Sequence, residues 1–496
     1  MKILYFELSK AAEKHPDKIG YSDKINKYTF SQLLELCNNL IYFFKDIPKK
    51  SKVILFDVNS VLQYLLLCVS SVIEITYIPL NPWFTEKDVK DILLTYSDSF
   101  FIYGSSFRNV NIERIRESLC SSHIFISTKE LHEKKQQRNI KIKQRKVESK
   151  LIFHTSGTTG KCKGVIYSIQ NLVRQGIIAN HHLNITSLDN YLNVYPGSHY
   201  GGVTAKIQCI LANASLYDIP YPTPLIISKT LIDEKITFFV AVPTIWTQLF
   251  PFLKLQNKSN ISLRMANIAS DKITKELMEE VMEYTGAVSI QGYGTTECGL
   301  ATLHNYKHNI IETGNVGKPL PGYKIILVDE ETYQPIKGKN LKGLILIRTS
   351  IGMDKYTIDI PFKISKNIYL TNDIGYFDDE NNLHICGRLQ SFAKINGFRV
   401  NLDDIDSFLK QEKQIMSKTV TMEIDSKDKI VIFIESNTEI QKDEIASEIK
   451  KSLGSIYEPY DIIRVNKFPR TNETNKIKIG VLKEEFYKQF QQGNKL

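Results

Sequence analysis

The cysteines of this 496-residue chain are few and unpaired: there are seven, an odd number, scattered from Cys37 to Cys386 without any Cys-x-x-Cys pair. Structural zinc sites and disulfide frameworks both need cysteines at defined, paired spacings. The sequence therefore gives no sign of a zinc site. Its cysteines fit a reducing compartment, and we expect a cytoplasmic protein.

Long uninterrupted apolar runs are also missing. The longest apolar stretch, residues 61–78, is broken by Gln63 and Glu74, so it predicts a buried helix running into a strand and not a membrane span. Near the N-terminus, Glu7 comes too early for the apolar core of a signal peptide. We expect neither a transmembrane segment nor a secretory leader.

Positive charge is the one marked bias in composition. The chain carries a net charge of +10, and residues 134–150 supply +7 of it, with eight Lys or Arg against Glu148 alone. No aromatic side chains are interleaved there to stack on bases, so we expect a solvated linker and no nucleic-acid partner. An acidic carrier protein or an anionic cofactor is the other class of ligand that this charge would suit.

Short apolar runs rich in β-branched and aromatic residues alternate with amphipathic segments. The runs are Val53–Phe56, Phe100–Tyr103, Ile124–Ser127, Leu151–Phe153, Phe238–Val242 and Val288–Ile290. This alternation predicts layered α/β structure with largely parallel sheets. Thr29 and Gln32, three residues apart, predict a capping box at the start of a helix that continues to Phe44.

The length of the chain exceeds what one hydrophobic core usually holds, so we expect more than one domain. Beyond Gly387-Arg388 the predicted elements are a helix over residues 400–409, strands over 419–424 and 430–434, a helix over 442–453 and a strand over 462–465. Such a set is typical of a small α+β domain. We therefore predict a large N-terminal α/β domain over residues 1–387 and a small C-terminal domain over residues 388–496.

Residues 153–164, Phe-His-Thr-Ser-Gly-Thr-Thr-Gly-Lys-Cys-Lys-Gly, carry the strongest functional signal. Gly157, Gly160 and Gly164 let the backbone adopt positive φ and bring N–H groups close to an anion, while hydroxyl groups and lysines add donors and charge. This composition predicts a polyphosphate-binding loop, with a flexible surface turn as the alternative. The loop is not a Walker A motif, because the residue after its first lysine is cysteine instead of Ser or Thr.

A second Gly-rich segment, Gln291 to Glu297, follows the apolar run at residues 287–290. Its two glycines predict a sharp turn that presents the ring of Tyr293 for stacking on a purine. Thr296 can donate to an oxyanion, and Glu297 can hold a hard cation. Core packing is the alternative interpretation of the tyrosine.

Three further residues carry charges that suit a nucleotide. Asp373 is predicted at a strand end, where its carboxylate can accept from ribose hydroxyls, and Arg388 places a fixed cation at the predicted domain boundary. Lys476 lies on a polar loop near the end of the chain. Taken singly, an aspartate in a turn is more often a local cap, and such a lysine would be an ordinary surface residue.

Together, in this order and spacing, these segments resemble the AMP-forming adenylating superfamily, which includes acyl- and aryl-CoA synthetases, adenylation domains of peptide synthetases and firefly luciferase. The resemblance covers essentially the whole chain, from Tyr28-Thr29-Phe30 through Pro79-Leu80-Asn81-Pro82 to the last lysines. It implies a two-step reaction, in which a carboxylate attacks the α-phosphorus of ATP to give an acyl-adenylate and a thiol then displaces AMP. It also implies layered α/β subdomains followed by a mobile α+β domain.

The resemblance assigns a role to each matching residue. The residues expected to bind the β- and γ-phosphates are Thr155, Ser156, Gly157, Thr158, Thr159, Gly160 and Lys163. Those expected around the adenosine are Gln291, Gly292, the stacking ring of Tyr293, Asp373 at the ribose and Arg388 at the adenylate. Those expected at the reacting groups are Thr296 at the α-phosphate and substrate carboxylate, Glu297 at Mg²⁺, and Lys476 bridging the carboxylate and the α-phosphate. Being on the small domain, Lys476 can leave the site when that domain rotates for the thiol step.

Several positions depart from the commonest pattern of the superfamily. Cys162 stands where proline is usual, Asn372 where the Gly of Thr-Gly-Asp is usual, and Asn475 where the Gly of Gly-Lys is usual. Gln390 occupies a hinge position that more often carries Asp or Lys, and Gly343-Leu344-Ile345 stands for Gly-Glu-Leu. None of these removes a charged group that the chemistry needs, so we expect activity; Asn475 and Gln390 bear on the rate of domain rotation.

The segment Val194 to Gly202 resembles the region in which acyl- and aryl-CoA ligases carry a histidine beside the acyl pocket, here His199. Amino-acid-activating members carry an aspartate there, because a buried ammonium without a counter-charge is costly. We therefore expect a plain carboxylic acid, fatty, short or aryl. The expected pocket walls include Ala269, Ser270 and Gly292; a packed, half-buried histidine is the alternative for His199.

Coenzyme A is the expected thiol, which makes the chain an acyl-CoA synthetase-like ligase of fatty-acid metabolism, using ATP and Mg²⁺. Residues 393–400, Ala-Lys-Ile-Asn-Gly-Phe-Arg-Val, resemble peptide-synthetase adenylation domains, so loading of an acyl or amino acid onto a carrier-protein phosphopantetheine is a second hypothesis. A third is a non-catalytic nucleotide-binding homologue. The retained charged residues Lys163, Glu297, Arg388 and Lys476 argue against that third hypothesis.

Overall fold

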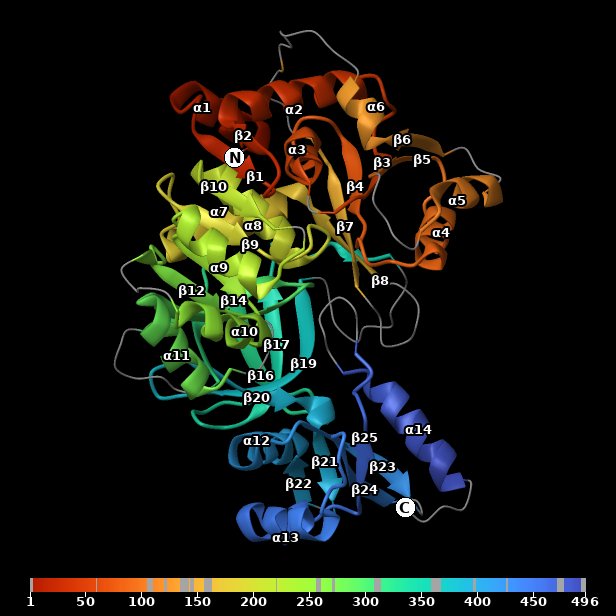
Figure 1. Cartoon of the computed structure of the whole chain (residues 1–496), viewed down its shortest axis with the longest axis vertical. Coiled ribbons are helices and arrows are strands. Elements are labelled where there is room, and N and C mark those ends of the chain that lie inside the picture. Colours follow the sequence, from red (N-terminus) through yellow and green to blue (C-terminus); the bar gives the residue numbers. More distant parts are fainter. Residues whose placement is uncertain are drawn as a thin grey trace. The chain divides into compact units, whose positions relative to one another are not determined.

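The computed structural model divides the chain into two compact units, shown in Figure 1. The residues it describes are 3–58, 60–104, 110–119, 123–133, 142, 147–155, 163–219, 221–255, 260–269, 273–306, 314–357, 367–395, 398–424, 427–470 and 477–491. The first unit comprises Met1–Ile326, Leu346–Leu370 and Phe377–His384, and the second comprises Leu327–Ile345, Thr371–Tyr376 and Ile385–Leu496.

A mixed sheet runs through the first unit in the order β15-β14-β13-β12-β11-β9-β10-β1-β2. Its middle strands, from β13 to β1, pair in parallel, and antiparallel pairs occur at both ends. The bounds are β1 (Ile19–Ser22), β2 (Lys27–Thr29), β9 (Asn190–Asn193), β10 (Ser215–Asp218), β11 (Phe238–Ala241), β12 (Met265–Ile268), β13 (Val288–Thr295), β14 (Gly299–Tyr306) and β15 (Asn315–Pro319).

A second sheet of the same unit follows the order β18-β8-β7-β4-β3-β5-β6. Strands β7, β4, β3, β5 and β6 are parallel, whereas β8 and β18 add antiparallel pairs at one edge. The bounds are β3 (Ser51–Phe56), β4 (Ile75–Pro79), β5 (Ser99–Tyr103), β6 (Ile124–Ser127), β7 (Lys150–Thr155), β8 (Lys163–Ser168) and β18 (Lys355–Tyr356). The predicted largely parallel α/β layers are therefore confirmed.

Helices connect the parallel strands of the first unit. They are α1 (Leu4–Lys14), α2 (Phe30–Phe44), α3 (Val61–Ser70), α4 (Glu86–Thr95), α5 (Ile112–Ser118), α6 (Thr128–Glu133), α7 (Ile169–Leu183), α8 (Tyr200–Ala212), α9 (Pro224–Asp233), α10 (Pro243–Leu253) and α11 (Lys275–Thr285). The predicted capping box is present, with Thr29 accepting from the Gln32 amide and donating its own amide to the Gln32 side chain. Every residue of α3 is buried, including the polar Gln63 and Ser70, as expected of a helix that is apolar on most of its surface.

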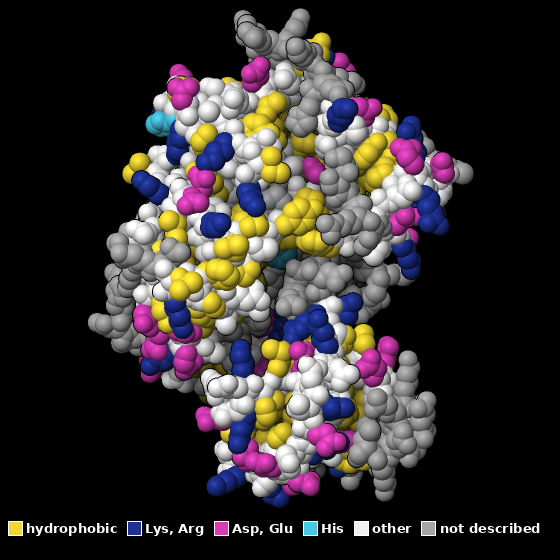
Figure 2. All heavy atoms as spheres, viewed as in Figure 1, with side chains coloured by type: hydrophobic (Ala, Val, Ile, Leu, Met, Phe, Trp, Pro, Cys, Tyr) yellow, Lys and Arg dark blue, Asp and Glu magenta, His cyan; other side chains and the backbone are white. Residues whose placement is uncertain are grey.

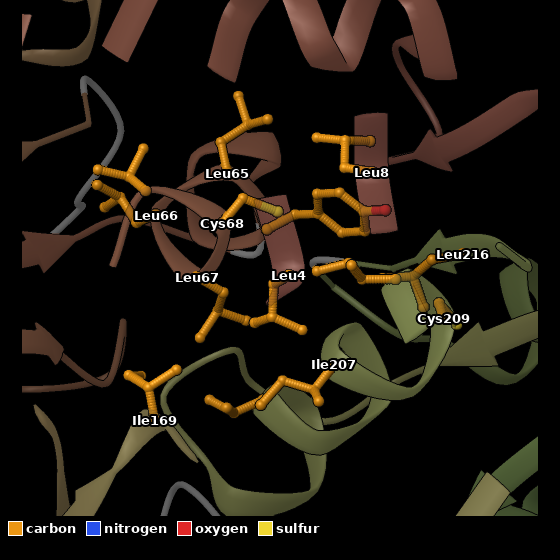
Figure 3. Packing of buried hydrophobic residues seen from close by; sticks show 14 of the residues in the cluster. Leu4, Leu8, Leu65, Leu66, Leu67, Cys68, Ile169, Ile207, Cys209 and Leu216 are labelled. Atoms are coloured by element: carbon orange, nitrogen blue, oxygen red, sulfur yellow. The ribbon is translucent and has the colours of Figure 1, made fainter. Parts of the chain in front are cut away.

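The main core of the first unit lies between helices from distant parts of the sequence. Figure 3 shows Leu4 and Leu8 from α1 facing a row of residues from α3, with Ile207 from α8 and Leu216 from β10 closing the cluster. These side chains are at most 1% exposed. Burial of this many apolar side chains, each contributing about 1.5–3 kcal/mol, fixes α8 and the strands around it.

The second unit contains most of the C-terminal elements. They are the hairpin β21 (Phe392–Ile395) and β22 (Phe398–Asn401), the sheet β23 (Ser417–Ile424), β24 (Lys427–Glu435) and β25 (Asp461–Val465), and helices α12 (Leu402–Lys413), α13 (Lys442–Leu453) and α14 (Ile479–Gln491). Four strands have residues in both units: β16 (Tyr323–Val328), β17 (Gly343–Thr349), β19 (Ile368–Phe377) and β20 (Leu383–Arg388). Helix α13 has the predicted bounds, and α12 begins two residues later than predicted.

The surface carries charges of both signs. Figure 2 shows basic and acidic side chains interspersed over the visible face, among the residues drawn in colour. Most of the basic segment 134–150 lies outside the described residues. Within the described part of the chain, no helix combines the length and apolarity needed to cross a bilayer.

Candidate active site

The predicted phosphate-binding loop connects two antiparallel strands of the second sheet. Strand β7 ends at Thr155 and β8 begins at Lys163, and these two residues are paired in register. Ser156, Gly157, Thr158, Thr159 and Gly160 lie outside the described residues, as do the side chains of Thr155 and Lys163. The loop is therefore anchored at both ends by a strand pair.

Gly164 corrects one expectation of the sequence, because its φ is not positive. Its amide donates to Thr357 Oγ1 at 2.9 Å, and Thr357 donates its own amide to Gly164 O at 2.8 Å. A Cβ at this position would lie 2.5 Å from the Thr357 side chain. The glycine is needed for the close approach of a second segment and not for a special backbone angle.

The second Gly-rich segment is a strand and not the predicted sharp turn. Strand β13 continues through Gly292, Tyr293 and Gly294 to Thr295, paired with β14 across a bulge, and the chain reverses only at residues 296–298. A Cβ on Gly294 would lie 2.0 Å from Gly299 O, so this glycine permits close strand pairing. Gln291 is buried and Tyr293 half-buried.

Thr296 and Glu297 lie on that reversal, the Glu297 turn (residues 296–298), and both are half-buried. The Glu297 carboxylate accepts from the phenol of Tyr356, with Oη 2.8 Å from Oε1, and the Glu297 carbonyl accepts from the Met353 amide at 2.8 Å. The carboxylate therefore has a polar neighbour and does not point into packed hydrocarbon.

The carboxylate of Glu297 is the one candidate metal ligand that the sequence suggested. Among the described residues, no group of three or more His, Cys, Asp or Glu side chains could hold a metal ion by itself. A nucleotide-bound Mg²⁺ needs less than that, because one or two carboxylates are completed by phosphate oxygens and water. A lone, half-buried carboxylate fits this mode of binding.

His199 stands at the N-cap of α8, at the end of the His199 loop (residues 194–199). Its Nδ1 accepts from the Gly201 amide at 3.1 Å, so in the neutral ring the proton is on Nε2. The ring stacks on Tyr195, with centroids 5.5 Å apart and planes 16° apart. His199 is half-buried, and its ring is held in place by the hydrogen bond from Gly201 and by the stacking contact with Tyr195.

A buried side chain joins the His199 loop to the Glu297 turn. Gln175, on α7, accepts from Tyr200 Oη at 2.7 Å and donates to Cys298 O at 3.1 Å and to Ile351 O at 2.7 Å. Tyr200 directly follows His199, and Cys298 directly follows Glu297. Two segments that are about a hundred residues apart in sequence are thus brought together within the first unit.

Asp373 and Arg388 form an ion pair in the second unit, with Arg388 Nε 3.4 Å from Asp373 Oδ1. Asp373 is in the middle of β19, not at a strand end as predicted, and it follows Asn372, whose φ is +60°. The Asp373 side chain is 10% exposed and the Arg388 side chain 67% exposed. The guanidinium therefore presents most of its surface to solvent beside the carboxylate.

The remaining predicted positions are only partly described. Ala269 directly follows Ile268, the last residue of β12. Ile268 is paired in register with Gln291 of β13, which directly precedes Gly292. Ser270 and Lys476 lie outside the described residues.

Sequence reasoning missed Tyr356, which bonds to Glu297, and also Gln175 and Thr357, which bond to residues next to the candidate segments. Gln175 lies in the middle of an amphipathic helix and Tyr356 in a two-residue strand, so neither lies in a recognisable motif. Only the three-dimensional contacts identify them.

Comparison with known proteins places these features in a family. The family model described as AMP-binding enzyme matches residues 8–357. The chain belongs to the AMP-binding enzyme family. The resemblance to the AMP-forming adenylating superfamily stated from its motifs is confirmed.

Relatives within the family fall into more than one class. The chain is 26% identical to bacitracin synthase 1 of Bacillus licheniformis, in an alignment that covers 80% of this chain and 8% of that protein. It is 27% identical to the mitochondrial acyl-coenzyme A synthetase ACSM4 of Rattus norvegicus, in an alignment that covers 68% of this chain and 61% of that protein. It therefore spans less than two thirds of either relative.

Solved structures support the fold over nearly the whole chain. The ATP-bound MatB of Rhodopseudomonas palustris superposes with a TM-score of 0.85 at 19% identity, covering 98% of each chain. The O-succinylbenzoate coenzyme A synthetase MenE of Bacillus subtilis, in complex with ATP and magnesium, gives a TM-score of 0.83 at 20% identity, covering 96% of this chain and 99% of that one. The predicted α/β fold class of this AMP-binding enzyme is confirmed.

Proposed function

We propose that this chain is an ATP-dependent acid–thiol ligase, which converts a carboxylic acid into an acyl-adenylate and then into a thioester. The observation that carries the proposal is the bridge through Gln175, which joins the helix start beside His199 to the turn that holds Glu297. An acyl-binding residue and a metal-binding carboxylate must lie near each other if the acid is to meet the α-phosphate.

The first step joins two anions, so the surrounding residues must supply positive charge and oriented donors. In the proposed mechanism the loop between β7 and β8, with Lys163, binds the β- and γ-phosphates, and Thr296 donates to the α-phosphate. Lys476 bridges the attacking carboxylate and the α-phosphate. A carboxylate oxygen then bonds to the α-phosphorus as the bond to pyrophosphate breaks.

We assign the metal position to Glu297. Mg²⁺ bound there would neutralise charge on the phosphates, and the protein's part is to present the carboxylate in a fixed orientation. The half-buried setting of Glu297 and its bond from Tyr356 support that assignment.

The second unit contributes the groups assigned to the ribose and adenylate. Asp373 would accept from ribose hydroxyls, and Arg388, exposed at 67% of its side chain, would contact the adenylate. We propose that residues 1–387, which include Asp373, and residues 388–496 act as the two domains. Lys476 then leaves the site when the domain 388–496 rotates for the thiol step.

The substrate class follows from the His199 loop, where no aspartate replaces the histidine to pair with a substrate ammonium. We therefore propose a fatty, short or aryl acid, with coenzyme A as the thiol. Ala269 and Gly292 are assigned to the wall of the acyl pocket; a Cβ on Gly292 would lie 2.6 Å from Leu300, so this glycine allows Leu300 to approach β13.

Loading of a carrier protein is the second candidate. The match to bacitracin synthase 1, which covers 80% of this chain, and the residues 393–400 in the hairpin of β21 and β22 favour it. Both candidates share the first half-reaction and differ only in the thiol.

The test is thioester formation. The protein is incubated with ATP, Mg²⁺ and a panel of fatty and aryl acids, together with either coenzyme A or a phosphopantetheinylated carrier, and products are identified by mass spectrometry. We expect acyl-CoA. Thioester only on the carrier would establish the second candidate, and AMP release without thioester would contradict both.

Lys476→Ala gives a sharper test of the mechanism. Because Lys476 is assigned to the first half-reaction alone, the variant should lose adenylate formation by at least about a thousandfold and retain thioester formation from supplied acyl-AMP. Lys478→Ala, which removes an exposed lysine two residues further on, is the matched control and should keep both half-reactions. Equal loss of both half-reactions in Lys476→Ala would refute the assigned role.

A further inference from the structure

One short segment of the first unit, Ile351–Thr357, contacts two of the candidate site segments and the Gln175 side chain. Its Ile351 carbonyl accepts from Gln175 Nε2. The Met353 amide donates to Glu297 O, and Tyr356 Oη donates to Glu297 Oε1. Thr357 and Gly164 bond to each other in both directions, and all of these distances are 2.7–2.9 Å. The segment therefore connects the strand that leaves the phosphate loop with the Glu297 turn.

The same segment is fixed from outside the site. Strand β18 pairs with β8, and the Asp354 amide donates to Ile166 O at 2.7 Å. Lys150, the first residue of β7, forms an ion pair with Asp354. Asn171 Nδ2 donates to Gly352 O at 3.0 Å, and Tyr369 Oη donates to Met353 O at 2.8 Å. With this many anchors, the position of the Tyr356 phenol is set by the fold.

The phenol has one chemical option toward Glu297. An ionised carboxylate can only accept hydrogen bonds, so in the 2.8 Å contact the Tyr356 hydroxyl is the donor and Glu297 Oε1 the acceptor. A donor fixed on Oε1 restricts the rotation of the carboxylate about its last bond. A hydrogen-bonded partner of this kind holds a metal ligand in position before the metal arrives.

We propose that Tyr356 is a positioning residue, which fixes the Glu297 carboxylate for the metal ion of the nucleotide and links it through Thr357 to the end of the phosphate loop. The inference rests on the proposed function, because it takes Glu297 as the metal ligand. It goes further by assigning a role to a residue outside the segments on which the family resemblance rests.

The direct test is Tyr356→Phe, which removes only the hydroxyl. Loss of a bond to a metal-ligating carboxylate typically weakens metal binding about 10- to 100-fold, and we expect the Mg²⁺ concentration for half-maximal ATP binding to rise by about tenfold. ATP binding is measured by calorimetry across a Mg²⁺ series, with thioester formation followed in parallel. An unchanged Mg²⁺ dependence in a folded Tyr356→Phe protein would overturn the proposal.

Tyr369→Phe is the matched control. It deletes a phenol that also bonds to this segment, at the Met353 carbonyl instead of the carboxylate. We expect the thermal stability of Tyr369→Phe to fall by about as much as that of Tyr356→Phe, while the Mg²⁺ dependence of its ATP binding stays that of the wild type. An equal shift in both variants would mean that the segment as a whole, and not the bond to Glu297, controls the metal.

A double-mutant cycle with Glu297→Gln makes the role specific. Once the carboxylate is gone, Tyr356→Phe should produce no further change in Mg²⁺ dependence. A full additional loss in the Glu297→Gln background would overturn the proposal. If the wild type bound ATP with Mg²⁺ but formed no adenylate with any acid, the proposed function would fail while the role of Tyr356 would still be tested by the binding series.

Discussion

The His199 loop and the Glu297 turn are held by different kinds of buried contact. Beneath the loop, Asn193 donates from Nδ2 to Tyr195 O at 2.9 Å and to Asp218 Oδ1 at 2.7 Å. Asp218 is ion-paired with Lys206 at 2.7 Å, and neither side chain has any exposed surface. The contacts described at the Glu297 turn come from uncharged donors: the phenols of Tyr356 and Tyr323, a backbone amide and the side-chain amide of Gln175.

This difference predicts how each half of the site responds to mutation. Removing one member of a buried ion pair leaves an uncompensated charge, which costs far more than losing a single neutral hydrogen bond. Replacing the whole pair by neutral groups of similar size is often tolerated. We therefore expect a single substitution beneath the His199 loop to cause a large loss of folding stability, and each substitution at the Glu297 turn to cause a smaller one.

The largest expected effect is that of Lys206→Met. Leaving Asp218 buried without its cation should lower the free energy of unfolding by about 3–5 kcal/mol. Both tryptophans, Trp83 and Trp246, are in the first unit, so their fluorescence during chemical denaturation reports on the unit that contains the pair.

The double variant Lys206→Met/Asp218→Asn is the control for that experiment. The new amide can still accept from Asn193, and no charge remains to be neutralised, so most of the lost stability should return. If Lys206→Met alone cost less than about 1 kcal/mol, the contrast between the two regions would not hold.

Gln175→Leu should have the next largest effect on stability. The Ile351 carbonyl and the Tyr200 hydroxyl lose their bond to Gln175, while the Cys298 carbonyl keeps the one from Tyr323 Oη. We expect a loss of about 2–4 kcal/mol in the free energy of unfolding. Adenylation should fall as well, because the His199 loop and the Glu297 turn are no longer joined.

Asn180→Leu, on the same helix, is the matched control. Asn180 donates to Gln208 O at 2.9 Å on α8, so the variant loses one bond between the same two helices away from Glu297. We expect a loss of about 1 kcal/mol with unchanged adenylation. Equal loss of activity in both variants would show that Gln175 acts only through general stability.

His154 adds a third kind of buried polar group, a base kept neutral next to the predicted phosphate-binding loop. Burial lowers the pKa of His154 to about 4, and Tyr96 Oη lies 3.1 Å from its Nε2. Between pH 6.5 and 4 the unfolded chain binds a proton there that the folded chain does not, so stability falls as the pH falls.

The expected loss between pH 7.5 and pH 5 is about 2 kcal/mol from this residue, measured as the change in chemical unfolding midpoint and slope. His154→Phe should remove that part of the pH dependence. A variant whose stability still falls as steeply as that of the wild type would exclude His154 as the titrating group.

Local patterns predicted the elements well where one physical signal dominated. Helix α13 has the bounds its apolar spacing and flanking residues predicted, and Thr29 caps α2 as its partner Gln32 three residues later indicated. The apolar run at residues 61–78 became a fully buried helix followed by β4.

Prediction failed where the reason for a residue lies in a distant segment. Gly294 suggested a turn, but it is needed because β14 passes close to β13, and Gly164 is needed because Thr357 passes close to it. Gln175 and Tyr356 gave no signal at all, since their partners lie 123 and 59 residues away. Such contacts follow from the tertiary fold and not from periodicity.

Pyrophosphate exchange tests the central claim most directly. The purified protein is incubated with ATP, Mg²⁺ and labelled pyrophosphate, with single acids from fatty, aryl and amino-acid classes and with no thiol present. We predict that label enters ATP only when a fatty, short or aryl acid is added, and that Glu297→Gln loses most of this exchange. Exchange with amino acids alone would contradict the proposed substrate class, and no exchange with any acid would contradict adenylate formation itself.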